Sequence, residues 1–170
     1  MDIIRIDTPI FKFRLAQHEE LKSELLHLIE YSEAGKEEGQ DSISRTDWRL
    51  DSERLYFQKL NIFLEPYLEN ILFKEMYYSK FKIIGCWFQQ YEKDDRHTWH
   101  THLPSTWTGI YYLELPEDGP RTTLLSPLKD KIITPEVDEG DIILFPSIIK
   151  HCSLKNASNK RKTVISFNIE

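Results

Sequence analysis

Three histidines have the spacing to hold a metal ion. His100 and His102 are two residues apart in the segment Trp99-His100-Thr101-His102, and His151 lies far downstream. On an extended segment, side chains alternate between the two faces of a sheet, so His100 and His102 share a face. A third imidazole from a distant strand completes one face of a coordination sphere and leaves other positions open. The spacing therefore predicts a metal site with room for further ligands.

A cationic cluster follows the third histidine. Arg161 lies ten residues after His151, and its guanidinium offers a planar fork for a carboxylate. Thr163, two residues further on, is expected to share the face of Arg161 and to donate a hydroxyl hydrogen bond to the same carboxylate. Lys162 is expected on the opposite face, in solvent.

Composition limits the class of protein. The 170 residues fit one domain with a substantial core, and the formal charge of −6 argues against nucleic-acid binding. The sequence contains no apolar run near the roughly 20 residues that span a bilayer, and its start lacks a signal-peptide pattern. The two cysteines, Cys86 and Cys152, are not in a CxxC spacing. We expect a reduced, cytoplasmic setting without membrane partners.

The first half of the chain has helical periodicity. Apolar residues recur at helical spacing over 16–31 and again over 51–78, where Pro66 is expected to split or kink the helix. Short opening strands are expected around the Thr8-Pro9 turn. The polar segment 33–44 is expected to be a mobile loop.

The second half has strand periodicity with turn signals between the strands. The expected strands cover 81–91, 107–115, 121–125, 131–134, 141–145, 149–154 and 162–169. Short strands without intervening helices indicate an antiparallel sandwich or jelly roll. We therefore expect an all-β core with flanking helices (α+β): a cupin-like double-stranded β-helix over 80–170, carrying the metal site, after a helical support region over 1–79.

The motifs of residues 84–170 resemble those of a known superfamily. The resemblance is carried by His100-Thr101-His102, Thr108 to Leu113, Glu139 to Ser147, His151, Asn156, Arg161 to Thr163, and Ile165 to Asn168. In these motifs the chain is similar to the Fe(II)- and 2-oxoglutarate-dependent oxygenases, and within them to a small group with HxH where HxD is usual. Small forms of this kind are common in phage genomes, so a phage-encoded protein would act in the host cytoplasm.

The resemblance implies a role for each matching residue. His100 and His151 match the iron-binding histidines, and His102 occupies the position of the usual acid. His102 either coordinates the metal or is replaced there by water; Asp94, Asp95 and Glu114 are alternative acids. The cosubstrate 2-oxoglutarate would be bound by Arg161, Thr163 and Asn168, with Tyr91 and Tyr112 either donating to it or packing in the core.

The implied activity is a 2-oxoglutarate-dependent dioxygenase reaction, most simply hydroxylation with release of succinate and carbon dioxide. The substrate is a small molecule or a peptide that the sequence does not identify. Aromatic residues near the HxH motif are candidates to contact it, namely His97, Trp99, Trp107 and Trp48.

Two other interpretations remain open from the sequence. A cupin-type dioxygenase with three histidines would use oxygen without 2-oxoglutarate and would have no need of Arg161 and Thr163. A jelly-roll binding module would hold Zn(II), or no metal, and would have no activity. Formation of succinate would distinguish the 2-oxoglutarate-dependent dioxygenase from both of these alternatives.

Overall fold

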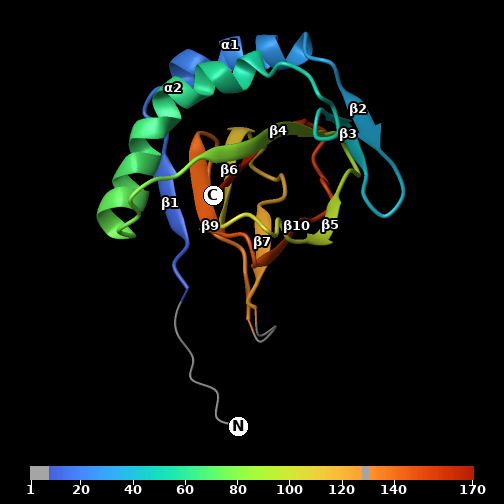
Figure 1. Ribbon diagram of the computed structural model, residues 1–170. Coiled ribbons are helices and arrows are strands. Elements are labelled where there is room, and N and C mark those ends of the chain that lie inside the picture. The colour runs from blue at the N-terminus through green and yellow to red at the C-terminus, as the bar shows by residue number, and fades with distance from the viewer. Residues whose placement is uncertain (1–7, 128–130) are drawn as a thin grey trace.

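The computed structural model describes residues 8–127 and 131–170, whose strands form two antiparallel sheets (Figure 1). The major sheet has the strand order β1-β9-β6-β11-β4-β3-β2, and the minor sheet has the order β5-β10-β7-β8. The major-sheet strands are β1 (Phe11–Arg14), β2 (Gly35–Glu37), β3 (Ile43–Thr46), β4 (Ile83–Tyr91), β6 (Trp107–Glu114), β9 (Asp141–Pro146) and β11 (Lys162–Ile169). The minor-sheet strands are β5 (His97–His100), β7 (Thr122–Leu125), β8 (Ile132–Ile133) and β10 (Lys150–Ser153).

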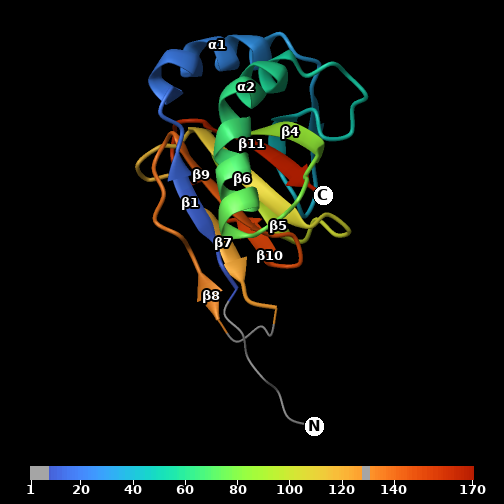
Figure 2. The same cartoon turned by 60° about the vertical axis from the view of Figure 1, so that its left-hand side comes forward.

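Two helices cover one face of the major sheet, as the two views show (Figures 1 and 2). They are α1 (His18–Glu30) and α2 (Leu55–Glu69), and the π-helix η1 (Asn70–Glu75) continues α2. Each helix buries an apolar stripe against the sheet, because leucines recur at helical spacing. The resulting core includes Leu25, Leu60, Leu64, Tyr111, Ile165 and Phe167.

A second core lies on the other face of the major sheet and includes residues of the minor sheet. It contains Tyr91, Ile110, Tyr112, Phe145 and Val164 from the major sheet, with Leu124 from β7. The expected all-β core with flanking helices is therefore confirmed, with two sheets in the arrangement of a double-stranded β-helix.

The central strand β11 shows how the two faces are divided. Ile165, Phe167 and Ile169 belong to the core beneath the helices. The alternate residues Lys162, Val164 and Ser166 line a cavity on the other face. Because side chains alternate along a strand, the apolar residues of β11 face the helices and a partly polar set faces the cavity.

Several expectations for the first half need correction. The segment 33–44 was expected to be a loop, yet it contains β2 and the start of β3, which pairs with β4. Pro66 does not split the helix: α2 continues to Glu69, and the change to π-helix begins at Asn70. The buried stripe of Leu60, Leu64 and Leu68 continues past the proline and holds the helix on the sheet.

The opening of the chain is described only in part. The predicted strand residues before the Thr8-Pro9 turn lie outside the described residues, and β1 follows that turn and pairs with β9. Cys86 and Cys152 are both free thiols. The described ranges contain no helix that is long and apolar enough to cross a membrane.

Candidate metal centre

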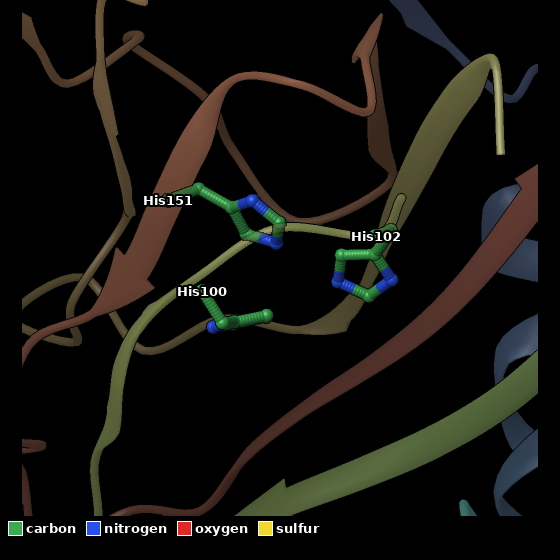
Figure 3. Close-up of side chains that lie close together, drawn as sticks. All are labelled: His100, His102 and His151. Carbon is green, nitrogen blue, oxygen red and sulfur yellow. The ribbon is translucent and has the colours of Figure 1, made fainter. Parts of the chain in front are cut away.

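The three predicted ligands meet at one place in the fold. His100 ends β5 and pairs directly with His151 on β10, while His102 follows β5 by two residues. One potential ligand atom from each ring lies within 4.8 Å of the others. Figure 3 shows the three imidazoles grouped around a common space. The sequence prediction of an HxH…H cluster is confirmed as a geometric arrangement.

Each of the three rings is oriented by a hydrogen bond. The Nδ1 atoms of His100 and His151 lie 2.7 Å from the Thr98 carbonyl and 3.2 Å from the Ile149 carbonyl. A carbonyl accepts only, so each Nδ1 carries the proton and each Nε2 keeps its lone pair. His102 is hydrogen-bonded to the side chain of Asn168. Partners of this kind are typical of metal-binding histidines.

The electrostatic environment keeps the histidines neutral. Burial lowers the pKa of His102 to about 3, with further lowering by His100 and His97. Burial and the same neighbouring rings hold the pKa of His151 well below its ordinary value. Burial also lowers the pKa of His100, against opposing effects of Thr98 and Asp41. Metal ions bind the neutral imidazole, so these rings are ready ligands at neutral pH.

The donor set fits a divalent transition metal. Three neutral imidazoles suit iron, zinc, copper or nickel, whereas calcium and magnesium prefer oxygen ligands. Asp94, Asp95 and Glu114 are not members of the cluster among the described residues. Asp95 instead accepts hydrogen bonds from Ser42 and Ser44, so these acids do not replace His102.

A buried lysine extends the site beyond the histidines. Lys162 is 1% exposed and lines the same cavity as the three imidazoles. Its Nζ donates a hydrogen bond of 2.8 Å to Ser153 and lies 5.0 Å from the Tyr91 ring centroid. Burial lowers the pKa of Lys162 to about 7. The expectation that Lys162 is in solvent is wrong.

Arg161, which directly precedes β11, and Thr163 point away from this cavity. The Arg161 guanidinium donates to Glu114 through Nε at 2.9 Å and Nη2 at 3.3 Å. The Thr163 hydroxyl also donates to Glu114. The two side chains share a face, as expected, but neither lines the cavity. Arg161 was expected to bind the far carboxylate of 2-oxoglutarate, but here its guanidinium is paired with Glu114 and lies outside the cavity.

The other residues expected at the cosubstrate take different positions. Tyr91 lines the cavity beside Lys162. Tyr112 is fully buried behind it, and its hydroxyl donates to Thr122 at 2.8 Å. Asn168 contacts His102 and accepts a hydrogen bond from Thr108, so its contacts orient the metal site.

The four candidate substrate residues fall into three groups. His97 lines the cavity and stacks on His100 with ring centroids 3.8 Å apart. Trp48 and Trp99 are partly exposed, and Trp48 packs near Trp87 at 6.5 Å. Trp107 is 3% exposed in the core beneath the helices, where its Nε1 donates to Tyr78. Trp107 therefore cannot contact a substrate at the cavity.

The sequence analysis also missed residues that shape the cavity. Trp87 stacks on His102 with ring centroids 5.1 Å apart and an interplanar angle of 9°. Gln89, two residues on and on the same face of β4, hydrogen-bonds His97 at 3.1 Å. The signal was present as period-two alternation in β4, because Trp87, Gln89 and Tyr91 share one face.

Several solved structures are similar to this architecture over most of the chain. A 2OG-Fe(II) oxygenase-family oxidoreductase from Burkholderia pseudomallei matches with a TM-score of 0.74 and 14% identity, over 95% of this chain and 85% of that chain. A Pseudomonas putida prolyl-4-hydroxylase matches with a TM-score of 0.70 and 10% identity, over 96% and 92%. The alpha-ketoglutarate-dependent epimerase SnoN of nogalamycin biosynthesis matches with a TM-score of 0.73 and 12% identity, over 96% and 78%.

No family model matches the sequence, and no curated protein matches it. At these identities the structural matches show the fold. The chain has the double-stranded β-helix fold that Fe(II)- and 2-oxoglutarate-dependent oxygenases share.

Proposed function

We propose that the protein is an Fe(II)- and 2-oxoglutarate-dependent oxygenase. The observation that carries this proposal is the presence, in one cavity, of three neutral metal-ligating histidines and a buried lysine. The fold supports it, because structural neighbours include oxygenases of this cofactor class. A metal alone would not explain why a lysine side chain is held in the same cavity.

The metal would be held by His100, His102 and His151. Bound Fe(II) supplies the redox chemistry that couples oxygen to 2-oxoglutarate, giving succinate, carbon dioxide and oxidised substrate. The protein contributes orientation of the ligands and exclusion of water. His151 is 3% exposed, which is consistent with a site shielded from bulk solvent.

Lys162 is proposed to bind the distal carboxylate of 2-oxoglutarate, in place of Arg161. Within the described residues, Lys162 has a hydroxyl partner but no ion pair with a carboxylate, so its burial carries a desolvation cost. A carboxylate bound beside it would offset this cost. The Ser153 hydroxyl, already in contact with Lys162, would lie beside the same anion.

The reaction outcome and the substrate belong to the same proposal. We infer hydroxylation of a small molecule or peptide, by similarity to the prolyl-4-hydroxylase. The match to an epimerase shows that proteins of this fold also catalyse reactions other than hydroxylation. His97, at the cavity, and the exposed residues Trp48 and Trp99 are the remaining candidates for substrate contact.

The direct test is incubation of the Fe(II)-loaded protein with 2-oxoglutarate and oxygen, with measurement of succinate by mass spectrometry. We expect slow succinate formation without substrate and none after His151→Ala. Oxygen consumption on a substrate without succinate would favour a three-histidine dioxygenase. Metal binding with neither product nor 2-oxoglutarate affinity would favour a binding module.

A further inference from the structure

Over residues 8–127 and 131–170, the candidate metal centre contains no carboxylate ligand, yet one carboxylate is connected to it through a neighbouring residue. Asp41 lies in the turn between β2 and β3, far in sequence from the three histidines. Its Oδ1 accepts hydrogen bonds from both the backbone N–H and the hydroxyl of Thr98, each at 2.7 Å. The Thr98 carbonyl in turn accepts the Nδ1–H of His100 at 2.7 Å. One residue therefore separates Asp41 from a metal ligand.

The second oxygen of Asp41 faces another ring of the site. Its Oδ2 lies 4.0 Å from Nε2 of His97. The His97 ring stacks on His100 with centroids 3.8 Å apart, and Gln89 contacts its Nδ1. The Asp41 carboxylate is therefore connected to His100 in two ways. Its Oδ1 is hydrogen-bonded to Thr98, which orients the His100 ring, and its Oδ2 lies near His97, which stacks on that ring.

The surrounding chain fixes Asp41 in this position. The neighbouring residue Ser42 forms an antiparallel bridge with Arg96, with backbone hydrogen bonds of 3.0 and 2.8 Å. The Arg96 side chain donates to the Gln40 carbonyl at 3.0 Å. These contacts join the β2–β3 turn to β5, the edge strand of the minor sheet that carries His100. An edge strand has a neighbour on one side only and gains from such support.

We infer that Asp41 is the positioning carboxylate of the metal centre. It holds Thr98 so that the carbonyl orients His100, and it places a negative charge beside a set of neutral ligands. This inference rests on the proposed function, because it assumes that His100 binds the metal. Outer residues that orient a ligating histidine typically change metal affinity about 10–100-fold when removed.

The test is titration of the metal-free protein with Co(II), followed by the visible absorption of the bound ion. Asp41→Ala is expected to bind Co(II) about 10–100-fold more weakly and to shift the absorption bands, because His100 loses its fixed orientation. Asp41→Asn keeps an acceptor oxygen without the charge and is expected to recover part of the affinity. Wild-type affinity and spectrum in Asp41→Ala would overturn the inference.

Two further variants separate positioning from general destabilisation. Asp94→Asn is the matched control, because Asp94 is an exposed carboxylate paired with Lys155 and asparagine tolerates its positive φ of 73°. It is expected to bind Co(II) as the wild type does. Thr98→Val removes the hydroxyl donor, and its effect is expected to be non-additive with that of Asp41→Ala. An equal loss in Asp94→Asn, or strict additivity, would contradict the inference.

The outcome also separates this inference from the proposed function. A wild-type protein that binds no Co(II) would refute the metal site itself. Tight Co(II) binding that Asp41→Ala leaves unchanged would refute only the role of Asp41. If Asp41→Ala does not fold, Asp41→Asn is compared with the wild type, with weakened binding and shifted absorption bands expected and a wild-type affinity and spectrum contradicting the inference.

Discussion

Arg161 directly precedes β11 and Lys162 is its first residue, but their cationic groups lie on opposite faces of the major sheet. Arg161 forms an ion pair with Glu114, whereas Lys162 is buried in the cavity of the three histidines. Within the part of the chain that the structure describes, Lys162 is therefore the lysine or arginine that lines this cavity. This relationship decides which residue should control the affinity for 2-oxoglutarate.

Replacement of Lys162 should weaken cosubstrate binding. Lys162→Met keeps the length and apolar stem of the side chain but removes the charge. Loss of a buried charged hydrogen bond of about 2–3 kcal/mol corresponds to a rise of about 30–150-fold in the dissociation constant for 2-oxoglutarate. Isothermal titration of the Fe(II) protein under anaerobic conditions measures this change. Arg161→Met, the matched control, should leave the dissociation constant within a factor of about two, because Arg161 does not line the cavity. The assignment of Lys162 is refuted if the effects of the two variants are reversed.

Single alanine variants of the histidines test whether all three bind the metal. If His102 is a ligand, His102→Ala should lose Fe(II) affinity to an extent similar to His100→Ala and His151→Ala, by at least about 100-fold. Equilibrium dialysis with metal analysis gives the three constants. Near-normal affinity in His102→Ala would show that water can occupy this position. His27→Ala, on the outer part of α1, serves as the control.

The burial of Lys162 should make stability depend on pH above neutrality. Because the pKa of Lys162 falls from the ordinary 10.5 to about 7 in the folded protein, the unfolded state binds more protons between these values. The free energy of unfolding should therefore rise with pH in this window, by at most about 1.4 kcal/mol per pH unit. Lys162→Met should lack this contribution. Denaturant unfolding of the metal-free wild type and variant at pH 7 and pH 9.5 gives the difference. Equal pH dependence in the two proteins would show that Lys162 does not titrate as proposed.

Close approach of β6 and the Phe167 ring makes Gly109 sensitive to substitution. A Cβ at Gly109 would lie 2.1 Å from Cζ of Phe167, which is fully buried in the core beneath the helices. Gly109→Ala should lower the free energy of unfolding by about 1–3 kcal/mol, because the ring must move within a packed core. Thermal and denaturant unfolding measure this loss. Gly85→Ala is the matched control on β4, where nothing lies within 4 Å of the added atom, and it should be close to neutral.

Much of the β core could be predicted from the sequence, because strand alternation and turn residues mark each strand locally. The last strand was predicted over 162–169, as observed, and the HxH spacing identified a shared face. The strands β2 and β3 could not be predicted in this way. Their segment is polar, and its pairing depends on Arg96 and β4, which are distant in sequence.

The orientation of β11 was predictable in principle but was assigned incorrectly. Ile165 and Phe167 are apolar, so they mark the face beneath the helices. Arg161 and Thr163 share their parity, whereas Lys162 shares the parity of Val164 and Ser166. The alternation along the strand therefore predicts that Lys162, rather than Arg161, faces the cavity of the three histidines. Trp107 was wrongly expected at the substrate site for a similar reason. It is close to the HxH motif in sequence, but its side chain lies on the face of the sheet that the helices cover.

The measurement that tests the central claim most directly is anaerobic titration of the Fe(II)-loaded protein with 2-oxoglutarate, followed by visible absorption. Chelation of Fe(II) by a 2-oxo acid produces a weak metal-to-ligand charge-transfer band. We predict a saturable band in the wild type and in Arg161→Met, with saturation shifted to much higher 2-oxoglutarate concentration in Lys162→Met. Absence of the band in a wild-type protein that demonstrably holds Fe(II) would contradict the proposed function.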